Sequence, residues 1–118
     1  MKFTDTLKRN YEFQRLYSKG KSAVTPYLVV YVRKTKKRSN KIGFTVSTKL
    51  GKAVVRNRVR RRLREIYRLN EERFATGLEI VTVARVRAVK ASYSQLEKAF
   101  LSACEKLGIL RETGESGQ

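Results

Sequence analysis

The chain has 118 residues, of which 28 are Lys or Arg and 10 are Asp or Glu, giving a formal net charge of +18. A hydrophobic content of 41% excludes a disordered basic tail, and the length suits one domain spanning residues 1–118. Such an excess of positive charge destabilises a compact domain unless a polyanion neutralises it, which favours nucleic acid as the partner. The absence of His and the single Cys104 exclude a disulfide framework and the common zinc-site spacings.

The apolar residues are dispersed along the chain. No run reaches the roughly 18 apolar residues of a membrane span. The first residues, MKFTDTLKRNYEF, lack the uninterrupted apolar core of a signal peptide. We therefore expect a cytoplasmic protein.

Residues 10–19 are predicted to form a short helix. Phe13 and Tyr17 fall on one face by their i, i+4 spacing. Asn10 is expected to cap the start of this helix, and Gly20 is expected to end it.

Two strands are predicted next, at residues 27–34 and 41–48, joined by a charged turn. The first strand, YLVVYVRK, is apolar on both faces. One face is therefore expected to cover the core and the other to meet a helix or a ligand. We expect the second strand to pair with the first.

The rest of the chain is predicted to form a long helix, a buried strand and a closing helix. Residues 52–75 contain no Pro or Gly and are rich in Arg, Leu and Glu, which favours a helix. Residues 77–86 form a continuous apolar run that is typical of a buried strand. The closing helix, 92–108, begins with a capping box of Ser92 and Gln95. The order of these elements predicts an α+β sandwich with helices on a sheet, ordered over about residues 5–110 and ending in a frayed tail at 111–118.

The long helix has an apolar face and an arginine face. At about 100° per residue, Val55, Val59, Leu63 and Ile66 fall together and are expected to be buried. Arg58 and Arg62 flank this stripe, and the opposite half carries Arg56, Asn57, Arg60, Arg61, Arg64 and Arg68.

The arginine face indicates a polyanionic partner. Arg56, Arg60 and Arg64 are like charges at i, i+4 spacing, and each such pair is unfavourable by a few tenths of a kcal/mol. Guanidinium groups bind phosphates in bidentate fashion and stack on bases, which loose solubilising charge does not require. Asn57 has two possible roles: it bonds its own backbone in the first turn, or it supplies a donor and acceptor to a base edge or sugar.

Residues 49–65, KLGKAVVRNRVRRRLRE, resemble the signature of the bacterial ribonuclease P protein subunit, written roughly K-x-G-x-A-V-x-R-N-R-x-K/R-R-x-x-R-E. The segments FQRLY, GFTVSTK and IVTVAR also resemble family segments, so the resemblance covers about residues 5–110. It implies an α-β-β-β-α-β-α two-layer sandwich with a left-handed βαβ crossover, of the type of the second domain of ribosomal protein S5.

The resemblance also implies a function. In this family the holoenzyme hydrolyses one phosphodiester of precursor tRNA and removes the 5′ leader, which gives the mature 5′ end. The catalytic centre lies in the RNA subunit, which chiefly binds the Mg²⁺ ions. The protein, inactive alone, binds the catalytic RNA and the leader as one protein per RNA.

Two sets of binding residues carry over by position, and the resemblance implies no catalytic or metal-binding residue in the protein. The set expected at the catalytic RNA is Lys49, Lys52, Arg56, Asn57, Arg58, Arg60, Arg61, Arg64 and Arg68. Arg58 has helix anchoring as an alternative role. The set expected around a leader-binding cleft is Phe13, Tyr17, Val29, Tyr31, Thr45, Arg56, Asn57 and Arg60. For Phe13 and Tyr17 the alternative is ordinary core packing.

Three other classes of protein remain as alternatives. A ribosomal protein or a general RNA chaperone can be equally basic and share this architecture. A stand-alone nuclease would need His or clustered acidic residues, which the chain lacks. A membrane-surface protein is least favoured, because the basic helix has no exposed Trp, Phe or Leu face to insert.

Overall fold

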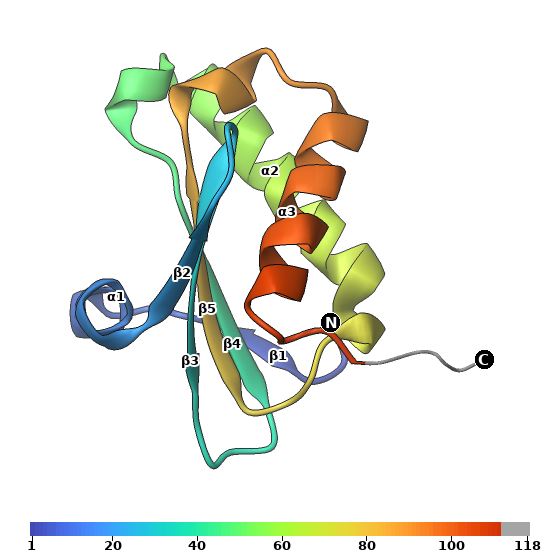
Figure 1. Cartoon of the computed structure of the whole chain (residues 1–118). Coiled ribbons are helices and arrows are strands. Elements are labelled where there is room, and N and C mark those ends of the chain that lie inside the picture. Colours follow the sequence, from blue (N-terminus) through green and yellow to red (C-terminus); the bar gives the residue numbers. More distant parts are fainter. Residues whose placement is uncertain (112–118) are drawn as a thin grey trace.

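The computed structural model describes residues 1–111, and a five-stranded sheet forms its centre. The helices α2 and α3 cover one face of the sheet and α1 lies on the other (Figure 1). In chain order the elements are β1 (Thr4–Thr6), α1 (Asn10–Lys19), β2 (Lys21–Val24), β3 (Leu28–Lys34), β4 (Asn40–Thr45), α2 (Ala53–Asn70), β5 (Leu78–Ala84) and α3 (Tyr93–Lys106). Short 3₁₀ turns lie at Thr48–Leu50 (η1), Glu71–Arg73 (η2) and Val86–Val89 (η3). Apart from Arg111, the expected frayed tail lies outside the described residues.

The strand order is β1-β4-β5-β3-β2, with β5 in the centre. Strand β5 is antiparallel to β3 and parallel to β4, so α2 forms the crossover from β4 to its parallel neighbour. The expectation that β3 and β4 pair with each other is wrong. The apolar sequence of β5 is buried on both faces, and a strand of this kind is most stable between two others. The short strands β1 and β2 were not expected from the residue pattern.

The face under α2 and α3 holds the larger core. The predicted stripe of α2 is confirmed at Val59, Leu63 and Ile66, which are fully or almost fully buried, and Tyr67 joins them. Val55, the first residue of the predicted stripe, is only half-buried. Helix α2 is therefore held by one face and leaves its arginine face outside.

The start of α1 differs from the sequence expectation, whereas the helix ends at Gly20 as expected. Glu12 accepts hydrogen bonds from the backbone N–H groups of Lys8 and Arg9 at 3.1 and 3.0 Å, whereas Asn10 is already helical. Gly20 ends the helix in extended conformation, with φ −80°, and not in the left-handed region. It is small for a steric reason, since a Cβ atom there would lie 2.6 Å from the carbonyl oxygen of Leu16.

The capping box of α3 is confirmed. The side chain of Ser92 accepts from the backbone N–H of Gln95 at 3.1 Å, and the side chain of Gln95 accepts from the backbone N–H of Ser92 at 2.9 Å. The two bonds satisfy N–H groups that the first turn of a helix leaves without partners.

Candidate RNA-binding surface

The arginines of α2 keep most of their charge available. Arg61 and Arg64 are exposed, and among residues 1–111 the only salt bridge of an α2 arginine joins Arg68 to Glu65. That pair is bidentate, with N–O distances of 2.7 and 2.9 Å. Arg68 therefore meets a ligand as part of a neutral pair, whereas Arg61 and Arg64 present unneutralised cations.

Asn57 orients a further arginine of α2, Arg60. Its side-chain oxygen accepts a hydrogen bond from Arg60 Nη1 at 3.0 Å, one turn further along the helix. A carboxylate at this position would do the same but would cancel the charge, whereas an amide leaves the guanidinium positive. Arg56 instead bends back, and its Nε donates to the carbonyl oxygen of Gly51 at 3.1 Å.

A groove of about 510 Å³ joins the arginine face to α1 and the sheet. Phe13 of α1 and Gly43 of β4 line one side, and the α2 side is formed by Asn57, Arg60, Arg61 and Arg64. Gly43 allows the close approach of Phe13, because a Cβ atom at Gly43 would lie 2.7 Å from the phenyl ring. One open groove thus combines two aromatic residues, Phe13 and Phe44, with three guanidinium groups.

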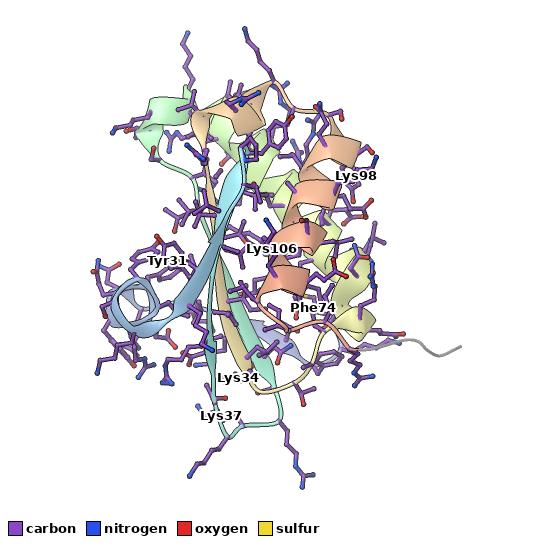
Figure 2. All side chains as sticks on the ribbon, in the orientation of Figure 1. Tyr31, Lys34, Lys37, Phe74, Lys98 and Lys106 are labelled. Atoms are coloured by element: carbon purple, nitrogen blue, oxygen red, sulfur yellow. The ribbon has the colours of Figure 1, made fainter. Side chains whose placement is uncertain are left out.

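Beside this groove lies a patch of half-buried side chains, which we call the tyrosine patch: Tyr17, Val29, Tyr31, Thr45 and Val83. The rings of Tyr17 and Tyr31 meet edge to face with centroids 5.1 Å apart, and the hydroxyls of Tyr17 and Thr45 are 2.6 Å apart. Val83 of β5 stands between Val29 and Thr45 in the strand register. Figure 2 shows Tyr31 on the side of the sheet that faces α1, opposite Phe74.

Comparison with known proteins identifies the family. The model of the family described as Ribonuclease P matches residues 1–108. The chain belongs to the ribonuclease P protein family. It is 41% identical over 110 residues to the ribonuclease P protein component of Alkaliphilus oremlandii (strain OhILAs), covering 93% of this chain and 96% of that protein. Identity to the component of Clostridioides difficile (strain 630) is 39% over 107 residues, covering 90% and 94%.

Solved ribonuclease P protein structures share the fold. The protein from Staphylococcus aureus has a TM-score of 0.83 at 29% identity, covering 90% of this chain and 97% of that one. The protein from Thermotoga maritima has a TM-score of 0.76 at 28% identity, covering 83% and 93%. This likeness confirms the α+β fold class.

In this ribonuclease P family member, the residues expected in one leader-binding cleft divide between two neighbouring surfaces. Phe13, Asn57 and Arg60 line the groove. Four others belong to the tyrosine patch: Tyr17, Val29, Tyr31 and Thr45. The side chain of Arg56 points back to Gly51. Lys49 and Lys52 are exposed at η1 and just before α2, on the approach to the arginine face.

Of the two arginines that flank the apolar stripe of α2, the structure shows a contact to the start of α3 for Arg62 and not for Arg58. Arg62 Nη1 donates to the carbonyl oxygen of Ala91 at 3.3 Å, which ties α2 to the start of α3. Arg58 is exposed and forms no side-chain hydrogen bond or salt bridge within the described part of the chain. The helical wheel could not separate the two, because the difference lies in a neighbour that is distant in sequence.

A charged cluster that the sequence did not predict lies under the flank of α1 that carries Glu12 and Arg15. Glu79 of β5 is buried and faces Arg15 at 3.7 Å and Arg33 at 3.6 Å. Beside it, Lys41 Nζ lies 3.0 Å from Glu12. Backbone N–H donation from Arg9 and Lys8 lowers the pKa of Glu12 to about 2. The one acidic residue in the apolar run of β5 was the available signal.

Over residues 1–111, no group of three or more His, Cys, Asp or Glu side chains comes together as metal ligands. No helix in the same range is long and apolar enough to cross a membrane.

Proposed function

We propose that the chain is the protein subunit of ribonuclease P, which binds the catalytic RNA through the arginine face of α2. The groove and the tyrosine patch bind the 5′ leader of precursor tRNA. In this role the protein assists endonucleolytic removal of the leader, and it is inactive without its RNA. Membership of the family and the arginine face support this assignment.

The observation that carries the proposal is the groove that Phe13 shares with Asn57, Arg60, Arg61 and Arg64. A single-stranded segment has no helical groove to be read, so its binding needs cations for the backbone and flat side chains for unstacked bases. Base stacking on aromatic rings tolerates any sequence, which suits a subunit that must accept many different leaders.

The protein's part in the reaction is electrostatic and positional. Arginines that neutralise phosphates release bound counterions, which favours association of the two RNA molecules with the protein. In our proposal the RNA subunit would chiefly hold the Mg²⁺ ions, which would stabilise charge at the scissile phosphodiester. The holoenzyme would contain one protein per RNA and act in the cytoplasm.

Reconstitution tests the overall assignment. With catalytic RNA present, the protein is expected to stimulate cleavage of precursor tRNA at low Mg²⁺ concentration, whereas the protein alone should cleave nothing. A ribosomal protein or a general RNA chaperone would bind RNA but give no leader-specific stimulation. Cleavage by the protein alone would identify a nuclease and overturn the proposal.

The tyrosine patch gives a sharper test. We expect Tyr31→Ala to weaken binding of precursor tRNA with a leader of several nucleotides by roughly tenfold, the cost of one lost base stack. Binding of mature tRNA by the holoenzyme should be unchanged, and shortening the leader to one nucleotide should remove the difference. Equal weakening of mature and precursor tRNA would show that the patch is only core packing.

A further inference from the structure

A second hollow lies on the chain, away from the groove and the tyrosine patch, and we call it the η3 hollow. Its volume is about 520 Å³, and its walls come from η1, from the residue just before β3, from the turn η3 and from the first turn of α3. The residues that line it are Tyr27, Leu50, Val86, Arg87, Val89, Lys90, Ala91 and Gln95.

The hollow has an apolar floor and a cationic rim. Leu50 and Ala91 are buried, and Tyr27 and Val89 pack against the core beneath α2 and α3. Val86 is 59% exposed, although it is a large aliphatic residue on a tight turn. An exposed aliphatic side chain beside a concave apolar surface suggests that something apolar covers both.

The positive charge of the rim is not neutralised. Arg87 and Lys90 are exposed, no acidic residue lines the hollow, and the first turn of α3 carries none. The guanidinium of Arg87 lies over the ring of Tyr27, with its Cζ 5.6 Å from the centroid, so the ring positions it at the hollow. Arg85 is held differently, because it donates to the carbonyl oxygen of Thr25 at 2.9 Å.

A ligand with a flat face that can cover an apolar surface and with a negative charge beside it fits this combination, and an unpaired nucleotide is such a ligand. Its base would cover the aliphatic floor, and its phosphate would meet the guanidinium and ammonium groups. The volume is within the range of small-ligand sites and leaves room for a purine. The hollow is also continuous with the expected RNA-binding residues, because η1, which contains Lys49, packs against η3.

We propose that an unpaired nucleotide of the catalytic RNA inserts into the η3 hollow, with its base against Val86 and its phosphate on Arg87 and Lys90. The proposal rests on the proposed function, because it takes the RNA subunit as the ligand of α2. The hollow lies against the core beneath α2 and α3, whereas the tyrosine patch lies on the α1 side of the sheet. The RNA bound along α2 is therefore the one that reaches the hollow.

Two matched pairs of variants test this proposal. Val86→Ser is compared with Val24→Ser, because Val24 is equally exposed, at 59%, but lies on the edge strand β2. Arg87→Ala is compared with Lys37→Ala, which removes an exposed cation from the turn between β3 and β4, at the far end of the sheet (Figure 2). Circular dichroism and thermal unfolding of all four variants show whether each remains folded.

Affinity for the catalytic RNA without substrate is measured at several salt concentrations. Val86→Ser should weaken binding by about three- to tenfold with the salt dependence unchanged, because a base contact releases no counterion. Arg87→Ala should weaken binding and make the slope of log affinity against log salt shallower by about 0.7 to 0.9. Chemical probing of the RNA should show one or a few unpaired nucleotides that lose protection in Val86→Ser and keep it in Val24→Ser.

The outcomes separate this proposal from the proposed function. If the parent protein neither binds the catalytic RNA nor stimulates cleavage, the proposed function fails. If the parent does both and folded Val86→Ser matches Val24→Ser in affinity and protection, only the η3 site is overturned. An effect confined to precursor tRNA with a long leader would also overturn it, because the ligand would then be the leader.

Discussion

The two faces of the sheet are covered to different extents. On one side α2 and α3 together bury a continuous core that includes Tyr67, Phe74 and Phe100. On the other side the ten-residue helix α1 buries Leu16 against Val81 and leaves the rings around it half-buried. The first side, which we call the closed face, is packed like the interior of a small domain. The second side, which we call the open face, leaves part of its apolar surface exposed to solvent.

This difference indicates where stability and binding reside. The closed face supplies the apolar burial that holds a highly charged chain together. The open face keeps aromatic rings at the surface, and a charged cluster, not further apolar packing, fixes the far flank of α1. Substitutions on the two faces should therefore separate loss of stability from loss of ligand affinity.

The largest effect is expected on the closed face. Phe100→Ala should lower the free energy of unfolding by about 3–5 kcal/mol, because it leaves a cavity among fully buried side chains. Tyr31→Ala on the open face should cost clearly less, since its ring is already half-exposed. Urea unfolding of both variants measures the difference. Equal losses would mean that the open face is as well packed as the closed one.

A smaller effect is expected at the start of α1. Glu12→Gln should lower the free energy of unfolding by about 1–2 kcal/mol near neutral pH, because charged acceptors make the stronger hydrogen bonds. The pKa of Glu12 is lowered in the folded chain to about 2. Its contribution is therefore complete above the unfolded pKa and is lost as the pH falls toward 2.

Stability measured between pH 5 and pH 2 tests this sign. The parent should lose stability over this range more steeply than Glu12→Gln. The control is Glu105→Gln, because Glu105 is exposed on α3 and forms no salt bridge among residues 1–111. Parallel pH profiles for the parent and Glu12→Gln would contradict the assignment.

The smallest change in the free energy of unfolding is expected for two arginines at the edge of the closed face, Arg62 and Arg58. Arg62→Ala should cost about 1 kcal/mol, because it removes a hydrogen bond to Ala91. Arg58→Ala should stay within about 0.5 kcal/mol, as for most exposed positions. Thermal unfolding ranks them, and a larger loss for Arg58→Ala would restore it as the anchoring residue.

Periodicity in the sequence was enough to predict the elements that bury one clear face. The stripe of Val59, Leu63 and Ile66 predicted the orientation of α2, and the apolar run of β5 predicted a buried strand. The residue pattern could not predict the strand order. The strands that flank β5 are tens of residues away in sequence, and the pattern of one strand does not say which distant strand pairs with it. The short polar strands β1 and β2 have no pattern of their own and form by pairing with a neighbour.

The candidate site likewise has features that the sequence predicts and features that it does not. The arginine face follows from the helical period, so its residues could be named from the sequence. The hydrogen bond from Arg60 to Asn57 and the bond from Arg62 to Ala91 depend on rotamers and on tertiary neighbours. The η3 hollow was missed because three separated segments build it, and each of them is unremarkable by itself.

The central position of β5 affects how the chain is assembled. Its register pairs Leu28 with Ala84, so the sheet joins segments more than fifty positions apart. On the ribosome, β3 and β4 emerge early, but each has an open edge until residues 78–84 follow. Distant pairing of this kind slows folding and leaves strand edges free to associate with other chains. The lysines and arginine at 36–38, in the turn between β3 and β4, place like charges beside these unpaired strand edges. The charges oppose aggregation during synthesis.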